Sequence, residues 1–257
     1  MHVLITNDDG IHAPGLWALH RAFAADHAVT VVAPDRERSA VGHGITLNQP
    51  LRFETARVNG DAAGYAVSGT PADCVKLGLA ELLDQPPDLV ISGINPGANV
   101  GINVNYSGTV AAAKEAALAG IPALAVSIIA PGTAHLADAA RFAERFARRL
   151  MARPLPAGTF LNVNVPDLPL TAVRGVRWSR QGSGPFAQRF ERRKDPRNRT
   201  YFWQGCDSLG ADTAPDVDSA ALAGQYIAVT PIKCDMTDYD VLRELGRWEI
   251  SIAGDDD

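Results

Sequence analysis

The sequence has few cysteines, and they lie far apart. Cys74, Cys206 and Cys234 are its only three, so the chain offers neither a disulfide framework nor the paired spacing of a zinc site. No run approaches the ~20 apolar residues that cross a bilayer. The opening stretch, MHVLITNDDG, lacks the charged region and cleavage site of a signal peptide. We therefore expect a cytoplasmic protein with no membrane partner and no cysteine chemistry.

Two common nucleotide-binding motifs are also missing, because neither GxGxxG nor the P-loop pattern GxxxxGK[ST] occurs in the chain. An excess of basic residues is missing too. The 24 Lys and Arg are outnumbered by 29 Asp and Glu, which gives a formal net charge of −5. This balance argues against nucleic acid as a partner.

What the sequence does contain is an alternation of short apolar runs and helical patterns over its first 165 residues. We expect strands over 2–6, 28–34, 88–93, 122–129 and 159–166, and helices over 71–83, 109–120 and 134–152. Another helix is expected over the apolar pattern of 16–27, with Pro14 as its opening residue. Residues 44–70 alternate and carry turn signals, which predicts a hairpin-like excursion. The alternation favours an α/β fold with a doubly wound, mostly parallel sheet, whereas a TIM barrel would need eight such units.

The last third of the chain has a different character. Residues 173–203 are basic and aromatic, which is typical of a solvated hairpin or a subunit contact, and residues 206–224 are acidic and loop-like. Further strands are predicted over 225–234 and 247–252, and a disordered acidic tail over 254–257. Because no clear linker interrupts the chain, we predict one domain over 1–257, with an α/β core (1–170) and a C-terminal extension (171–257).

Oxygen-bearing side chains follow three of the predicted strands. Asp8 and Asp9 come after the first, Ser39 lies in the loop after the second, and Asn95 follows the third. Ligands of open α/β sheets bind outside the carboxyl ends of the strands, where these loops meet. Without a His/Cys cluster beside them, such oxygens suit a hard divalent cation, Mg²⁺, Mn²⁺ or Ca²⁺.

Each of these residues also has an ordinary interpretation. Aspartate is a favoured helix N-cap, and loop serine and asparagine commonly occupy turns. Two adjacent carboxylates followed by Gly10 favour the metal site, because a cation turns their repulsion into binding. His12 and His43 lie in the same loops and are candidates for proton transfer, although loop histidines more often only form hydrogen bonds.

A second element with possible chemistry is the start of the helix predicted over 109–120. Ser107 and Thr109 precede or open it, where free backbone N–H groups and the helix dipole favour an anion. A simple Ser or Thr cap would look the same. Beside a divalent cation, however, an anion site suggests hydrolysis of a phosphate ester by an activated water.

At these residues the sequence closely resembles the SurE (survival protein E) family of metal-dependent nucleotidases. The matching segments are VLITNDDGIHAPG (3–15), VVAPDRERSAVGHGIT (31–46), SGTPADCV (68–75), DLVISGINPGANVG (88–101), YSGTVAAAKEA (106–116), IPALAVS (121–127) and VTPIKCDMTDYD (229–240). Together they span nearly the whole chain. The resemblance implies a Rossmann-like core whose C-terminal hairpin is exchanged between subunits, in a homodimer or homotetramer.

The resemblance also implies a reaction and the residues that perform it. One divalent ion per subunit, Mn²⁺ or Mg²⁺, with Ca²⁺ able to replace it in a crystal, would be held by Asp8, Asp9, Ser39 and Asn95. The substrates would be nucleoside 5′-monophosphates, with 3′-monophosphates and short polyphosphate in addition. Asp8, Asp9 and Asn95 would be catalytic, with either Asp9 or a histidine taking the proton of the water. The phosphate would be bound by a set of five residues: Asn7, Ser39, Ser107, Gly108 and Thr109.

Three other classes of protein are compatible with parts of this pattern. A signalling receiver domain needs an acceptor aspartate after the third strand, where this chain has SGINPG. A phosphatase with a DxD nucleophile needs spaced rather than adjacent aspartates. A nucleotide-binding module without turnover stays open, although the usual motifs are missing.

Overall fold

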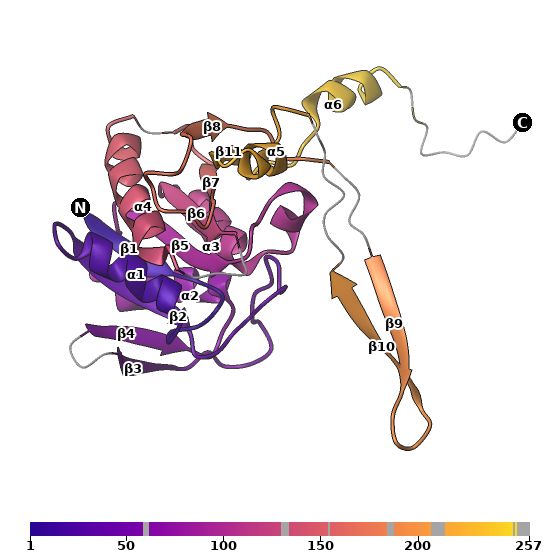
Figure 1. Ribbon diagram of the computed structural model, residues 1–257, viewed down its shortest axis with the longest axis horizontal. Helices are drawn as coiled ribbons and strands as arrows, with labels where there is room; N and C mark the ends of the chain where they lie inside the picture. Colours follow the sequence, from indigo (N-terminus) through magenta and orange to yellow (C-terminus); the bar gives the residue numbers. More distant parts are fainter. Residues whose placement is uncertain are drawn as a thin grey trace, which may run out of the picture.

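The computed structural model describes residues 1–58, 62–129, 134–153, 155–183, 188–206, 214–248 and 250. Over these ranges one mixed sheet has the strand order β3-β4-β2-β1-β5-β6-β7-β11-β8, and β9 and β10 form a separate pair (Figure 1). The strands are β1 (His2–Thr6), β2 (Ala28–Pro34), β3 (Phe53–Val58), β4 (Ala62–Val67), β5 (Leu89–Pro96), β6 (Ala123–Ile128), β7 (Thr159–Val165), β8 (Val176–Trp178), β9 (Gln188–Lys194), β10 (Thr200–Cys206) and β11 (Ile227–Lys233).

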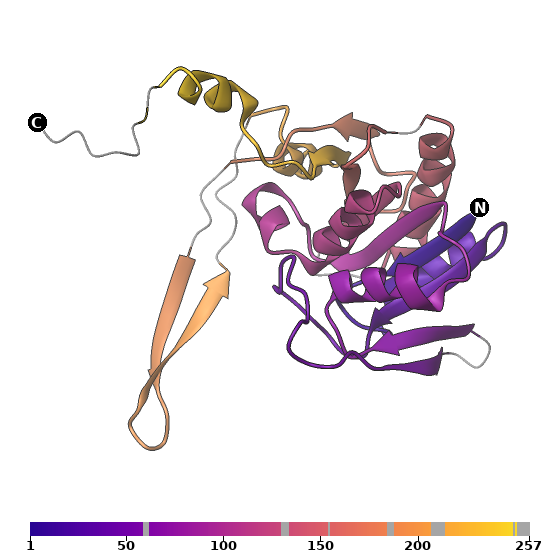
Figure 2. The ribbon, with the colours of Figure 1, turned by 180° about the vertical axis from the view of Figure 1, so that it is seen from behind.

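Helices cover both faces of this sheet, as seen from the two sides in Figures 1 and 2. They are α1 (Pro14–Phe23), α2 (Pro71–Leu77), α3 (Gly108–Leu118), α4 (Leu136–Met151), α5 (Asp218–Ala223) and α6 (Tyr239–Leu245), with short turns η1 (Gly78–Leu82) and η2 (Gly101–Asn105). Helices α1 and α4 pack in one buried cluster, and α2 and α3 in the other. The doubly wound α/β fold predicted from the alternation is confirmed.

The first strand shows why the core runs of the sequence are continuously apolar. Val3 and Ile5 point into the cluster below α1 and α4, whereas Leu4 points into the cluster below α2 and α3. All three side chains are fully buried. A parallel strand covered on both faces has no solvent side, so its sequence has no polar alternation.

The two edges of the sheet depart from parallel pairing. The excursion predicted over 44–70 contains an antiparallel pair, β3 and β4, which begins at Phe53. At the other edge β11 runs antiparallel to β7, and β8 is parallel to β11. Part of the C-terminal segment therefore completes the sheet.

Two predictions for the C-terminal segment are wrong. Residues 206–224 were expected to be a loop, but α5 occupies Asp218–Ala223; its Asp218 is fully buried and accepts hydrogen bonds from the Gly101 and Gly182 N–H groups. The strand predicted over 247–252 is not formed by Arg247, Trp248 or Ile250, which follow α6 as turn and coil. The rest of that stretch and the acidic tail lie outside the described residues.

The N-terminal helix is shorter than its pattern predicts. The helix begins at Pro14, as expected, but it ends at Phe23 and does not continue to His27. The N–H groups of Asp26 and His27 both donate to the carbonyl of Phe23, so the chain closes in a turn before β2. Among the described helices, none has the length and apolar character that spanning a bilayer requires.

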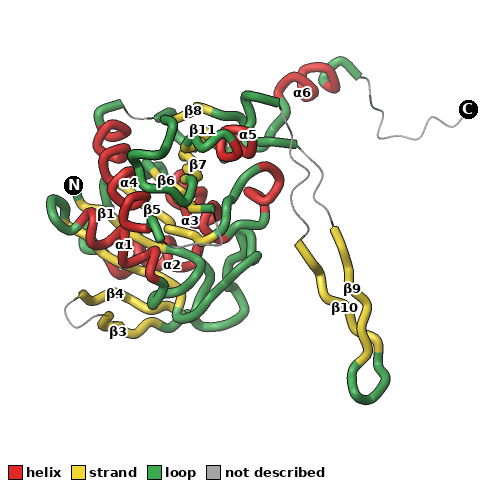
Figure 3. Tube along the Cα trace, viewed as in Figure 1, coloured by secondary structure: helices red, strands yellow, loops and turns green. Residues whose placement is uncertain are grey.

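The basic, aromatic segment forms the hairpin of β9 and β10, which pair antiparallel with each other. Figures 1 and 3 show it projecting away from the sheet. Phe190 and Phe202 share one of its faces, and Tyr201 and Trp203 share the other, because cross-strand partners lie on the same side. All four rings are exposed, so the hairpin has apolar surface on both faces.

Candidate active site

The loops after β1, β2 and β5 meet at one edge of the sheet because these strands are neighbours in the order β2-β1-β5. They surround a cavity of about 810 Å³. The side chains that line it come from the three loops, from the start of α3 and from β10: Asp8, Asp9, Glu37, Ser39, Ala40, Asn95, Pro96, Asn99, Asn103, Tyr106, Ser107 and Gln204. The four candidate metal ligands are therefore brought to one cavity.

Asp8 is held firmly in this cavity. Its side chain is 6% exposed, and the Thr109 hydroxyl donates to its Oδ1 at 2.5 Å. Burial raises the pKa of Asp8 above its ordinary value, against the hydrogen bond from Thr109, which lowers it. The Asp8 carboxylate is thus fixed to α3 through Oδ1.

Asp9 has an unsatisfied carboxylate. Its buried Oδ2 has no hydrogen-bond partner within the described part of the chain. Burial, together with the negative charges of Asp8 and Glu37, raises the pKa of Asp9 to about 7. A buried, unpartnered carboxylate oxygen is costly unless a proton or a cation binds it.

Glu37 is a cavity residue that the sequence motifs did not single out. It lines the cavity with the two aspartates, and the Ser39 hydroxyl donates to its Oε1 at 2.5 Å. Its position two residues before Ser39 in the same loop was the available signal. No Lys or Arg is among the described residues that line the cavity, so three carboxylates give it a negative field.

Asn95 and Ser107 line the cavity from different elements, the end of β5 and the start of α3. The Asn95 amide nitrogen donates to the Gly97 carbonyl at 2.7 Å. Because the nitrogen is engaged in this bond, the amide oxygen of Asn95 is the atom that can bind a cation. Ser107 caps α3 by accepting from the Val110 N–H. Its place in the cavity lining brings the N-terminus of α3 to the same site.

The other three residues expected at a phosphate lie behind the cavity surface. Asn7 is fully buried, and its amide bonds both the carbonyl and the N–H of Gly10. Thr109 is fully buried against Asp8. Gly108 packs directly against Asp8, because a Cβ added at Gly108 would stand 2.8 Å from the Asp8 Cβ. These three residues fix the aspartate loop.

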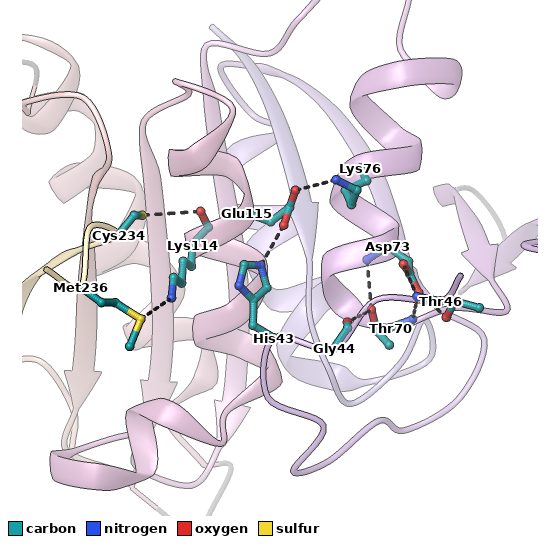
Figure 4. A network of polar contacts seen from close by, with 10 residues as sticks. All are labelled: His43, Gly44, Thr46, Thr70, Asp73, Lys76, Lys114, Glu115, Cys234 and Met236. Atoms are coloured by element: carbon teal, nitrogen blue, oxygen red, sulfur yellow. Dashed lines mark hydrogen bonds and ion pairs between the residues drawn. The ribbon is translucent and has the colours of Figure 1, made fainter. Parts of the chain in front are cut away.

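The two candidate histidines do not line the cavity. His12 is exposed. His43 contacts the Glu115 carboxylate of α3 at 2.8 Å, and Lys76 of α2 contacts the same carboxylate at 3.1 Å (Figure 4). The structure places His43 as an anchor of the loop that carries Ser39.

A second anchor holds the same loop at Thr46, three residues after His43. The Thr46 N–H and hydroxyl both donate to the Asp73 carboxylate of α2, and Asp73 also accepts from the Thr70 N–H at the start of that helix. The Thr70 hydroxyl donates to the carbonyl of Gly44 (Figure 4). The loop after β2 is thereby tied to both helices on one face of the sheet.

The oxygen donors fit a hard cation. Within the described residues no group of three His, Cys, Asp or Glu side chains is arranged for a metal ion. The candidate set instead combines two carboxylates with a hydroxyl and an amide, as magnesium and manganese sites do. The unpartnered Oδ2 of Asp9 is the observation that supports a cation at this position.

Comparisons with known proteins identify the family of this chain. The family model described as "Survival protein SurE" matches residues 3–188. The "5′-nucleotidase SurE" of Desulfatibacillum aliphaticivorans is 57% identical over 97% of this chain and 99% of its own length. Its counterpart in Syntrophobacter fumaroxidans is 49% identical over 97% and 100%.

A solved structure gives the same result for the fold. The SurE protein of Aquifex aeolicus superposes with a TM-score of 0.83 and 34% identity, over 95% of this chain and 98% of that one. The family match, the relatives and the shared fold each cover most of the chain. This chain belongs to the SurE family.

Proposed function

We propose that this protein is a divalent-metal-dependent 5′-nucleotidase that hydrolyses nucleoside 5′-monophosphates to nucleoside and phosphate. The observation that carries the proposal is the charge of the cavity. Asp8, Asp9 and Glu37 line it, and no Lys or Arg is among its described lining residues. An anionic phosphate alone would be repelled there, whereas a bound cation reverses the field. The relatives that carry the name 5′-nucleotidase support the choice of substrate.

Asp8, Asp9, Ser39 and Asn95 would hold the ion. When bound, it would polarise the phosphate and lower the pKa of the attacking water. Ser107 and the N–H groups at the start of α3 would bind phosphate oxygens, and Asp9 would accept the proton of the water. Tyr106 and Pro96 offer apolar surface in the same cavity for the nucleoside.

The finer features of the proposal follow the family resemblance. Nucleoside 3′-monophosphates and short polyphosphate would be further substrates, with Mn²⁺ or Mg²⁺ as the ion. The protein would act in the cytoplasm as a homodimer or homotetramer. The exposed rings on both faces of the β9–β10 hairpin support assembly, because an isolated two-stranded hairpin is marginally stable in water.

The first experiment is phosphate release from a panel of nucleoside monophosphates with Mn²⁺, Mg²⁺ or excess chelator. We expect turnover with a divalent ion, loss of turnover with chelator, and loss in the Asp9→Asn variant. Nucleotide binding by a folded protein without turnover under any ion would replace the enzyme with a binding module. Including 3′-monophosphates and polyphosphate in the panel tests the additional substrates.

A further inference from the structure

A second cavity, of about 640 Å³, lies between α4 and the edge strand β8. It is lined by the outer face and C-terminal end of α4, by the start of β7 and by β8: Phe142, Arg145, Phe146, Arg149, Leu150, Arg153, Leu155, Leu161, Val176 and Trp178. None of these residues lines the candidate active site. The two cavities are therefore separate sites.

The walls of this second cavity are aromatic. Phe142 and Phe146 stack with ring centroids 5.6 Å apart and an interplanar angle of 13°. Phe146 also meets Trp178 of β8 at 6.3 Å. Trp178 is 69% exposed, whereas Leu150 and Leu161 of the same cavity are buried. The cavity thus has an apolar floor and a large ring at its mouth.

The charge at this cavity has one sign. Arg145 and Arg149 stand one turn apart on α4, and Arg153 follows the end of the helix. In the described part of the chain, no ion pair or hydrogen bond engages their guanidinium groups, whereas Arg148 on the same helix pairs with Glu144 and Asp26. No carboxylate is among the described residues that line the cavity. Three arginines with no described ion-pair partner therefore line the α4 side of an apolar cavity, on a chain of net charge −5.

We infer that this cavity binds a soluble amphiphilic organic anion, whose acyl or aromatic body lies against Phe146 and Trp178 and whose acidic group is held by Arg145, Arg149 and Arg153. Guanidinium groups bind carboxylate, sulfonate and phosphate in bidentate fashion. The volume lies within the range of small-molecule sites, in which an apolar lining supplies affinity and a few polar groups supply orientation. This binding function is independent of the proposed nucleotidase activity.

A helix C-terminus also attracts basic residues through its dipole, which could account for Arg149 alone. The dipole does not account for the aromatic walls or for the clustering of three arginines at one cavity. The two roles differ in what they predict. A purely dipolar role changes thermal stability when the arginines are replaced, whereas a binding role changes affinity for anionic but not for neutral apolar ligands.

The test uses the full chain and two fluorescent probes of similar shape, anionic 8-anilinonaphthalene-1-sulfonate and its uncharged analogue N-phenyl-1-naphthylamine. In the Arg145→Glu/Arg149→Glu variant we expect the affinity for the anionic probe to fall roughly tenfold or more, with little change for the neutral probe. Trp178→Ala should weaken both probes. Decanoate should displace the anionic probe from the parent protein. Arg21→Glu, an exposed arginine on α1, is the matched control and should bind like the parent.

Three outcomes would overturn the inference. Equal affinity of the parent and the double variant for the anionic probe would mean that the probe does not bind at Arg145 and Arg149. A changed oligomer mass in Trp178→Ala would make this face a subunit contact. Sedimentation with phosphatidylglycerol vesicles, without displacement by decanoate, would assign the arginines to a membrane surface. Nucleotidase activity measured on the same variants should equal that of the parent, so failure of this inference is distinguishable from failure of the proposed function.

Discussion

At the scale of single residues, the ionised Asp9 carboxylate that the proposed activity needs lowers the stability of the metal-free protein. Its pKa is raised by burial to about 7, so between its ordinary value of 3.8 and about 7 the folded chain binds more protons than the unfolded chain. The free energy of unfolding of the metal-free protein therefore falls as pH rises through this window. We expect Asp9→Asn to raise Tm of the metal-free protein at pH 8, by about 2–4 °C for each kcal/mol of repulsion relieved.

Thermal unfolding in chelator at pH 5 and pH 8 measures this effect. The gain from Asp9→Asn should be large at pH 8 and small at pH 5, where Asp9 of the parent is already protonated. Adding Mn²⁺ should stabilise the parent and not the variant. Asp84→Asn, at an exposed aspartate, is the control. An equal gain at both pH values would show that ionisation of Asp9 is not the cause.

Gly108 tests how closely α3 must approach the aspartate loop. A Cβ there would stand 2.8 Å from the Asp8 Cβ and 3.1 Å from the Pro71 side chain. Asp8 would have to move, so we expect Gly108→Ala to lower kcat/KM roughly 10–100-fold, because small displacements of reacting groups are costly. Phosphate-release kinetics measure this. Gly78→Ala is the matched control, since its Cβ would lie 3.4 Å or more from the nearest side chain.

At the scale of elements, the Ser39 loop depends on its anchors to α2 and α3. The His43 ring contacts the Glu115 carboxylate at 2.8 Å and holds the loop while the cavity binds its ligands. Without this anchor the four candidate metal ligands are still present, but the loop that positions Ser39 becomes more mobile. We therefore expect His43→Ala to raise the half-saturating Mn²⁺ concentration roughly tenfold. Much of kcat should return at saturating Mn²⁺.

The same carboxylate supplies the control for this prediction. Lys76 also pairs with Glu115, but its side chain is 52% exposed, and exposed ion pairs contribute little. Lys76→Gln should therefore leave the Mn²⁺ titration nearly unchanged. If both variants shift the titration equally, the effect arises from the charge of Glu115 and not from anchoring of the loop.

Elements with a strong repeating pattern could be predicted from the sequence, and those defined by distant contacts could not. The buried strands around β1 follow directly from continuous apolar runs, because both faces of the sheet are covered. Helix α5 was missed because Asp218 counts as a polar loop residue in sequence, whereas in the fold it is buried against the Gly101 and Gly182 N–H groups. Helix α6 is only seven residues long and buries none of them, although Val241, Leu242 and Leu245 are apolar, so no packing against the sheet supports its short pattern.

The candidate site divides in the same way. Asp8 and Asp9 follow β1, Ser39 lies in the loop after β2 and Asn95 lies at the end of β5. Parallel pairing brings these strand ends together. The function of Thr109 as a hydrogen-bond donor to Asp8 joins positions 101 residues apart, which no local pattern reports. Glu37 belongs to a loop with several charged residues, and the sequence does not distinguish them. Only the fold shows that Glu37 is the one that lines the cavity.

At the scale of the whole molecule, the hairpin connects assembly with the site. Phe202 and Trp203 are 57% and 60% exposed on opposite faces of β10, and Gln204 of the same strand lines the active-site cavity. If a second subunit covers the hairpin, assembly also fixes the position of Gln204. Stability of the assembly and activity should then be linked through this strand.

This linkage makes a prediction about Phe202→Ser. Full burial of a Phe side chain contributes about 1.5–3 kcal/mol, and a subunit contact over Phe202 would lose this in the variant, so the variant should show a smaller mass by light scattering at micromolar concentration. Its specific activity should fall on dilution, while that of the parent stays constant over the same range. Arg197→Ser, in the exposed turn between β9 and β10, should leave both quantities unchanged. A parent that is monomeric and fully active at every concentration would mean that the hairpin completes neither an interface nor the site, and its exposed rings would then need a different partner.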